Sequence, residues 1–310
     1  MKERDAFPRI MSMTKFLPWL APAMMVGLLL DPGIMRAKEP FYPELTEAAY
    51  NGDLAQVKEL LASGVPIEST DGSSTALTCA AGNGKTEVVR YLSGQGANLE
   101  AQLGGLTPLA LAVYNDHFET ARLLVAKGAR LDGTGNYDHS PLQCSIENKR
   151  FDVAKWLLRQ GANPNLQNWR GNTALMEAVD HPDLVRFLIR MGAAVNIKQD
   201  QGQTALSFAI SGKNLESVRI LLAHGARQHL CRWDESAVMV AVQEGTSEIL
   251  RLLLQYHPWL EARTNGPYWG QQGQTALEIA LEMGNRKAAR ILREHGAREV
   301  SDPGIRGPWR

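Results

Sequence analysis

The sequence has no excess charge of either sign, because 33 lysine and arginine residues balance 33 aspartate and glutamate residues. Without a positive field, a protein has no general attraction for nucleic acid or for an anionic membrane surface. We therefore expect no nucleic-acid partner.

Cysteine is scarce as well, with only Cys79, Cys144 and Cys231 in 310 residues. An odd number of cysteines cannot all pair within one molecule, so no disulfide framework is indicated. We expect Cys79 and Cys144 to serve as small packing residues inside helices.

The motifs of common hydrolases and metalloproteases are missing: the sequence contains no Gly-x-Ser-x-Gly and no His-Glu-x-x-His. Gly84-Lys85-Thr86 is like the end of a phosphate-binding loop, but Cys79 stands where that loop needs glycine. We predict no enzyme activity, no cofactor, no metal and no small-molecule substrate. An enzyme or metal site around His229 and Cys231 is the alternative, although a structural zinc ion needs four ligands.

The one long uncharged run lies near the N-terminus, from Phe16 to Leu30, after the basic residues Lys2, Arg4, Arg9 and Lys15. Basic residues, an apolar run and then a small residue such as Ala37 are typical of a secretory signal peptide. The run is shorter than the roughly 20 apolar residues of a membrane-spanning helix. We predict that residues 1–37 are a signal peptide and that the protein is exported, to the periplasm or the medium. An uncleaved N-terminal membrane anchor is the alternative.

Two short phrases recur with a period of about 33 residues after residue 40. The first phrase is Thr or Ser, then Ala or Pro, then Leu or Val, beginning at Thr75, Thr107, Ser140, Thr173, Thr204, Ser236 and Thr275. The second phrase is Gly-Ala-x, beginning at Gly96, Gly128, Gly161, Gly192, Gly225 and Gly296. A degenerate copy with Leu45 and Ala48 in register opens the array.

Each phrase has a physical interpretation. A Thr or Ser hydroxyl can cap a helix N-terminus, and Pro108 or Pro141 directly after the cap suits the first helical turn. Each Gly-Ala glycine is placed to end the second helix in a left-handed conformation. Alanine inside each first helix allows neighbouring units to approach closely, and apolar residues at helical spacing in the second helices need a neighbouring unit to bury them.

With these phrases, the sequence resembles the ankyrin-repeat family, in particular an exported bacterial member. The resemblance implies an all-α solenoid of about eight helix-turn-helix repeats with hairpin fingers, covering residues 41–298. Residues 299–310 are rich in proline and glycine, and we expect a disordered tail.

Large aromatic residues occupy the finger tips, where polar residues are usual. Tyr137, Trp169 and Trp233 stand at three tips. An insertion between Arg263 and Gly273 adds Tyr268 and Trp269. Because aromatic residues are enriched in recognition surfaces, we predict these five as the partner-binding residues, with local packing as the alternative role.

The resemblance therefore implies a monomeric protein-interaction scaffold that binds another protein on the concave face formed by its fingers and inner helices. A more specific alternative is an immunity-type inhibitor of a secreted toxin or enzyme. A further alternative is a membrane-anchored accessory protein that stabilises an envelope complex, which requires residues 1–37 to remain uncleaved.

Overall fold

The computed structural model describes residues 42–133, 139–229, 235–256, 258, 260–264 and 273–298. This part of the chain contains sixteen α-helices and no β-strand, arranged as eight helical hairpins. The first helices of the hairpins are α1 (Pro43–Asn51), α3 (Ala76–Gly82), α5 (Pro108–Tyr114), α7 (Pro141–Glu147), α9 (Ala174–Glu177), α11 (Ala205–Ser211), α13 (Ala237–Gln243) and α15 (Ala276–Glu282). The second helices are α2 (Leu54–Ala62), α4 (Thr86–Gly94), α6 (Phe118–Ala126), α8 (Phe151–Gln160), α10 (Pro182–Arg190), α12 (Leu215–Ala223), α14 (Ser247–Leu254) and α16 (Arg286–Glu294).

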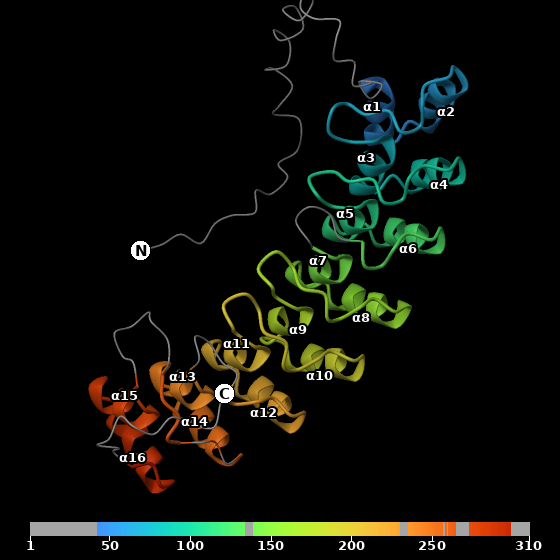
Figure 1. Cartoon of the computed structure of the whole chain (residues 1–310). Helices are drawn as coiled ribbons and strands as arrows, with labels where there is room; N and C mark the ends of the chain where they lie inside the picture. Colours follow the sequence, from blue (N-terminus) through green and yellow to red (C-terminus); the bar gives the residue numbers. More distant parts are fainter. Residues whose placement is uncertain are drawn as a thin grey trace, which may run out of the picture. The chain divides into compact units, whose positions relative to one another are not determined.

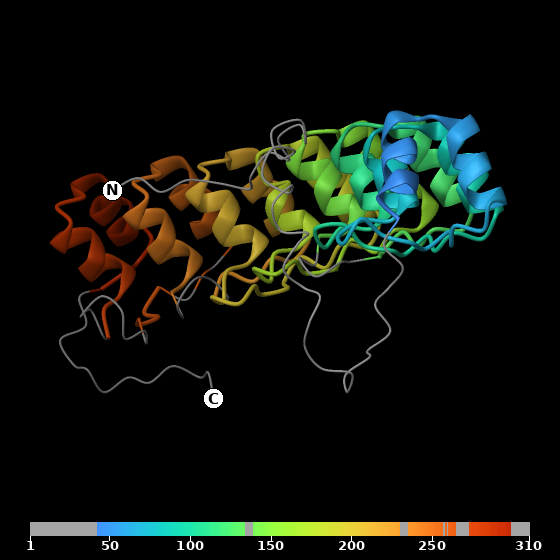
Figure 2. The same cartoon turned by 90° about the horizontal axis from the view of Figure 1, so that it is seen from above.

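The hairpins stack in chain order, so first helices form one row and second helices another (Figure 1). Each first helix packs against the first helix of the hairpin before and after it. Viewed from above, the two rows form two layers, and the connecting segments run along one edge of them (Figure 2). We call each segment between a Gly-Ala phrase and the next Thr or Ser cap a finger. The predicted solenoid of eight repeats is confirmed.

The predicted N-caps are confirmed at most first helices. The cap hydroxyl accepts a hydrogen bond from the backbone N–H three residues later at Thr75, Thr107, Ser140, Ser236 and Thr275. Thr173 makes no such bond, and its helix α9 has 4 residues where α3, α5 and α7 have 7 each.

Every predicted glycine stop has the left-handed backbone conformation, with φ between +82° and +100°. Glycine tolerates this conformation because it has no Cβ atom. Beside two of these stops, the imidazoles of His224 and His295 form 2.8 Å hydrogen bonds between Nδ1 and the carbonyl oxygens of Ile220 and Ile291. These two histidines therefore have a structural role at the ends of α12 and α16.

The core is continuous along the array and contains one small buried residue of each repeat, which lies within the first helix or, at Ala178, caps its end. These residues are at most 1% exposed: Ala48, Ala80, Ala112, Ser145, Ala178, Ala209, Ala241 and Ala280. No helix in the described ranges is both long enough and apolar enough to span a bilayer.

Neighbouring fingers are joined by side-chain hydrogen bonds that we call the inter-finger ladder. In each rung, the third residue of a Gly-Ala-x phrase donates its backbone N–H to a carboxylate or amide oxygen of the preceding finger. The acceptors are Glu68, Glu100, Asp132, Asn165, Asn196 and, before the last repeat, Glu261. Each rung connects two repeats, so the position of one finger sets the position of the next.

The turns between paired helices also use the left-handed conformation, and at Lys149 a side chain must tolerate φ = +58°. Replacing Lys149 with glycine should raise the free energy of unfolding by about 0.5 to 1 kcal/mol. The left-handed conformation destabilises the folded state of a residue with a Cβ atom, and removing this strain outweighs the greater conformational entropy that glycine loses on folding. Denaturant unfolding followed by circular dichroism checks this value. Lys127→Gly is the matched control, because the exposed Lys127 has φ = −86°, and this change should be destabilising. A loss of stability in both variants would contradict the argument.

Candidate protein-binding site

Trp169 is the one predicted binding residue that lies within the described part of the chain. Its side chain stands on the finger before α9 and is 49% exposed. The guanidinium of Arg170 lies over the indole, 4.4 Å from the ring centroid. Tyr137, Trp233, Tyr268 and Trp269 lie outside the described residues.

Buried amides hold the Trp169 finger in place. Asn168, which is 6% exposed, accepts 3.0 Å hydrogen bonds on Oδ1 from the backbone N–H groups of Arg170 and Asn172. Gln143, on α7 of the preceding repeat, donates from Nε2 to the carbonyl oxygens of Leu166 and Asn172. Trp169 is therefore presented on a backbone fixed from both sides, which lowers the entropy lost when a partner binds.

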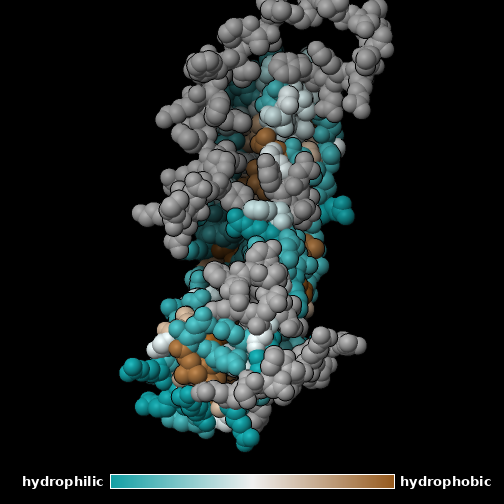
Figure 3. Space-filling view, turned by 60° about the vertical axis from the view of Figure 1, so that its left-hand side comes forward, coloured by the Kyte–Doolittle hydropathy of each residue, from teal (hydrophilic) through white to brown (hydrophobic). Residues whose placement is uncertain are grey.

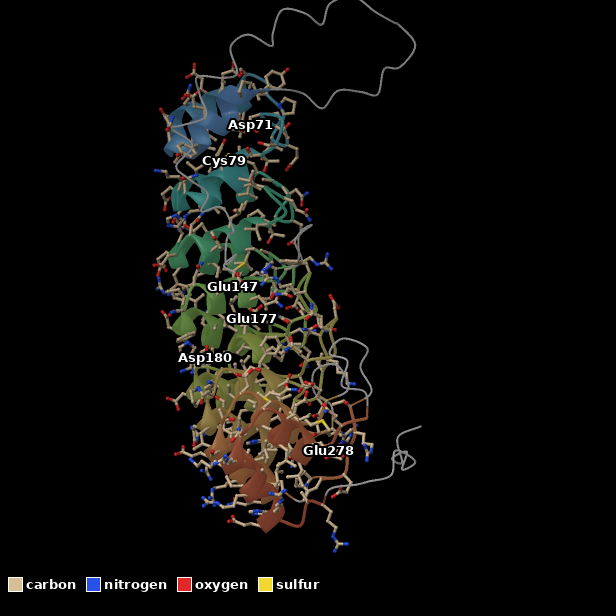
Figure 4. The ribbon with its side chains drawn as sticks, turned by 90° about the vertical axis from the view of Figure 1, so that its left-hand side faces the viewer. Asp71, Cys79, Glu147, Glu177, Asp180 and Glu278 are labelled. Atoms are coloured by element: carbon tan, nitrogen blue, oxygen red, sulfur yellow. The ribbon has the colours of Figure 1, made fainter. Side chains whose placement is uncertain are left out.

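Glu177, the last residue of α9, lies behind this finger in a slot that holds Glu47 in the first repeat and an apolar residue or cysteine in the other six. The equivalent residues are Cys79, Leu111, Cys144, Phe208, Val240 and Ile279. Oε1 of Glu177 accepts a 2.7 Å hydrogen bond from Nδ2 of Asn168, whereas Oε2 is buried without a hydrogen-bond partner. Glu147 occupies the end of α7 on the neighbouring repeat, on the same side of the array (Figure 4).

The surroundings change the protonation of both carboxyl groups. Burial, reinforced by the negative charge of Glu147, raises the pKa of Glu177 to about 8, although Arg170 and Asn168 act in the opposite direction. Burial also raises the pKa of Glu147. A cation brought by a partner would favour ionisation of this pair. The site can therefore couple binding to proton release.

Cys144 and His139 lie in the same region, but the arrangement does not favour nucleophilic catalysis. Burial and the charges of Glu147 and Glu177 raise the pKa of the Cys144 thiol far above its usual range. A reactive cysteine needs the opposite shift. The buried imidazole of His139 has Nδ1 3.5 Å from Oε2 of Glu147, so it faces a carboxylate.

No group of three or more histidine, cysteine, aspartate or glutamate residues in the described ranges could hold a metal ion. His229 closes one described stretch, whereas Cys231 lies outside it. Burial lowers the pKa of His229, and the charges of Arg227 and Lys198 act in the same direction.

The finger before α3 turns at Gly72, which has the left-handed conformation with φ = +98°. The carboxylate of Asp71 accepts hydrogen bonds from the backbone N–H groups of Ser73 and Ser74. Burial alone would raise the pKa of Asp71, but these bonds and those from the serine hydroxyls lower it overall.

Sequence reasoning missed Glu147, Glu177 and Asn168 as parts of the site. A signal for Glu177 was present, because once the repeats are aligned only Glu177 and Glu47 of the atypical first repeat are charged in a column of apolar residues and cysteines. Asn168 gives no comparable signal, since its role depends on the position of Glu177.

Comparison with known proteins identifies the repeats. The family model described as "Ankyrin repeats (3 copies)" matches residues 45–135, 100–168, 142–231 and 226–302. The human transient receptor potential cation channel subfamily A member 1 is 26% identical over 171 residues. That match covers 52% of this chain and 15% of the channel protein, so the two share only a segment.

One solved structure contains a chain that this protein matches over nearly its whole length. It is the Bd0816 predatory endopeptidase from Bdellovibrio bacteriovorus in complex with immunity protein Bd3460. The match has a TM-score of 0.51 and 31% sequence identity, and it covers 59% of this chain and 98% of the matched chain.

Proposed function

Because the chain belongs to the ankyrin-repeat family, whose repeats mediate protein–protein interaction, we propose that it is an immunity-type inhibitor. In this proposal it binds a secreted toxin or enzyme on the face formed by its fingers and first helices. The similarity to a chain from the endopeptidase–immunity protein complex supports this choice. The family is typically non-enzymatic, which agrees with a binding role.

The observation that carries the proposal is the Trp169 finger. A half-exposed indole on a backbone fixed by buried amides has the properties of an interface hot spot. The described surface around the fingers is mainly hydrophilic and has only small hydrophobic patches (Figure 3). A polar surface with few aromatic anchors is typical of a non-obligate interface.

The proposal also requires that the protein is exported. Residues 1–37 would act as a signal peptide and place the mature protein in the compartment of a secreted partner. Mass spectrometry of the mature N-terminus tests this part, and a chain that begins at Met1 in the membrane fraction would favour the anchored accessory protein instead.

The binding proposal is tested in two steps. Residues 38–310 are used to capture a partner from the cell envelope and culture fluid. The captured protein is then purified alone and its activity is measured with and without this chain. A toxin or enzyme whose activity falls at one equivalent supports the proposal, and one that binds without any loss of activity overturns the inhibitor function while retaining the scaffold function.

Replacing Trp169 with alanine should weaken binding of that partner by about tenfold and leave the thermal midpoint nearly unchanged, because the indole is half exposed. Isothermal titration calorimetry and thermal denaturation measure the two quantities. Tyr91→Ala on α4 is the control, since Tyr91 contacts Lys58 on the second-helix row, away from the fingers. Equal losses of affinity in both variants would remove Trp169 from the proposed interface.

A further inference from the structure

The second helices carry a regular charge pattern. Their fifth residue is always basic: Lys58, Arg90, Arg122, Lys155, Arg186, Arg219, Arg251 and Arg290. On α4, α6, α10 and α12 this residue pairs with an acidic residue three positions earlier, at distances of 3.4 to 3.7 Å. On these four of the eight second helices, the basic residue is therefore neutralised by a side chain of its own helix.

The pattern is not found on α2, α14 or α16, and it also breaks at α8. There the acidic residue, Asp152, pairs with Arg150 at 3.6 Å, and Lys155 instead places Nζ 5.9 Å from the ring centroid of Phe187 on α10. Lys155 has no carboxylate partner among the described residues.

Two additional arginines join Lys155. The ninth position of a second helix is small in α2, α4, α6 and α12, where it is Ala62, Gly94, Ala126 and Ala223. In the adjacent helices α8 and α10 it is Arg159 and Arg190. Their guanidinium carbons lie 5.3 Å and 5.6 Å from the same Phe187 centroid. Neither arginine forms an ion pair within the part of the chain that the structure describes.

Three cations thus surround one half-buried phenylalanine without a countercharge. Because each lies within 6 Å of the centroid, they are at most about 12 Å from one another. Like charges no farther apart than this repel each other. A ligand that supplies negative charge would remove this repulsion and gain charge-assisted hydrogen bonds.

We propose that Lys155, Arg159, Arg190 and Phe187 form a second docking surface, which accepts an acidic segment of a protein. One carboxylate carries a single negative charge against three cations, whereas alternate side chains of an extended peptide are about 7 Å apart and can supply several. An apolar side chain in the same segment covers the Phe187 ring. This surface lies on the second helices, so it is separate from the proposed interface at the Trp169 finger.

The test uses the full chain and the labelled peptide Ac-Glu-Asp-Phe-Asp-Glu-NH2, with affinity measured by fluorescence anisotropy at low salt. The Arg159→Gln/Arg190→Gln variant should bind at least about fivefold more weakly than the wild type. The control is Arg90→Gln/Arg122→Gln, which removes the same charge from residues that have acidic partners, and it should change affinity less than about twofold. All four arginines are exposed, so the folds should be retained, and circular dichroism confirms this.

Three results would overturn the proposal. They are equal losses in both double variants, no binding of the peptide to the wild type at millimolar concentration, and equal binding of the amide peptide Ac-Gln-Asn-Phe-Asn-Gln-NH2. Binding to phosphatidylglycerol vesicles that depends on Arg159 and Arg190, in the absence of peptide binding, would assign the surface to a membrane instead. Trp169→Ala should bind the peptide like the wild type, so failure at one surface can be distinguished from failure at the other.

Discussion

Replacing Glu177 with glutamine should raise the free energy of unfolding at pH 9 by about 2 kcal/mol and change it by less than about 0.5 kcal/mol at pH 4.5. The reason is the buried carboxyl group, whose pKa in the folded protein is raised to about 8. Glutamine preserves the acceptor that Asn168 uses and cannot ionise. Its amide nitrogen would occupy the position of Oε2, which has no hydrogen-bond partner, so the gain is smaller than the full pKa shift implies.

The direction of the pH effect follows from proton linkage. The unfolded carboxyl group ionises near its ordinary pKa of about 4.3, whereas the folded one retains its proton until the pH approaches 8. Folding is therefore less favourable as pH rises from about 4.5 to about 8, and no further loss occurs above that range. Urea unfolding of both proteins at several pH values measures the difference.

Glu147→Gln is the matched control, because the side chain of Glu147 is 31% exposed and water screens its charge. It should stabilise the protein less than Glu177→Gln at pH 9. A gain from Glu177→Gln that is the same at pH 4.5 and pH 9 would show that ionisation is not the cause.

Replacing Gly171 with alanine should lower the free energy of unfolding by about 3 kcal/mol. Gly171 has φ = +73°, which already costs a residue with a side chain about 1 kcal/mol. A Cβ atom there would also lie 2.7 Å from the backbone nitrogen of Asp200 in the next finger. Because that atom belongs to the backbone, the finger itself must move, at a cost of about 1 to 3 kcal/mol.

Gly161→Ala separates the two contributions. Its φ of +100° requires the same left-handed backbone, but no atom lies within 4 Å of the added Cβ. This variant should lose only about 1 kcal/mol, and denaturant unfolding of both variants gives the comparison. Equal losses at the two positions would contradict a close approach between the fingers. Gly171→Ala should also weaken partner binding, because it displaces the finger that carries Trp169.

The fold was predictable because its signals are local and recur in many copies. Thr107 followed by Pro108, or Gly128 followed by Ala129, marks a helix boundary without reference to any other part of the chain. Repetition at a period of about 33 residues then gives the stacking, since one unit cannot bury its own apolar face.

The site was predicted less well, because its chemistry arises between repeats. Trp169 could be identified as an unusual finger residue, but its orientation depends on Gln143 from the preceding repeat. The raised pKa of Glu177 depends on burial and on the charge of Glu147, which lies 30 positions earlier. The unpaired cations around Phe187 could not be recognised from the sequence, because Asp152 is near enough in sequence to pair with Lys155 but pairs with Arg150 instead. None of these contacts has a fixed spacing that a single sequence reveals.

The inter-finger ladder also has a mechanical consequence. A force that separates the two ends passes through every junction between repeats, and at each junction the rung shares the load with the packed helices. The weakest junction should therefore open first, and the chain should extend in steps of about one repeat. The 3.3 Å rung between Glu261 and Arg298, which spans the longest sequence interval, marks the junction where such stepwise extension should begin.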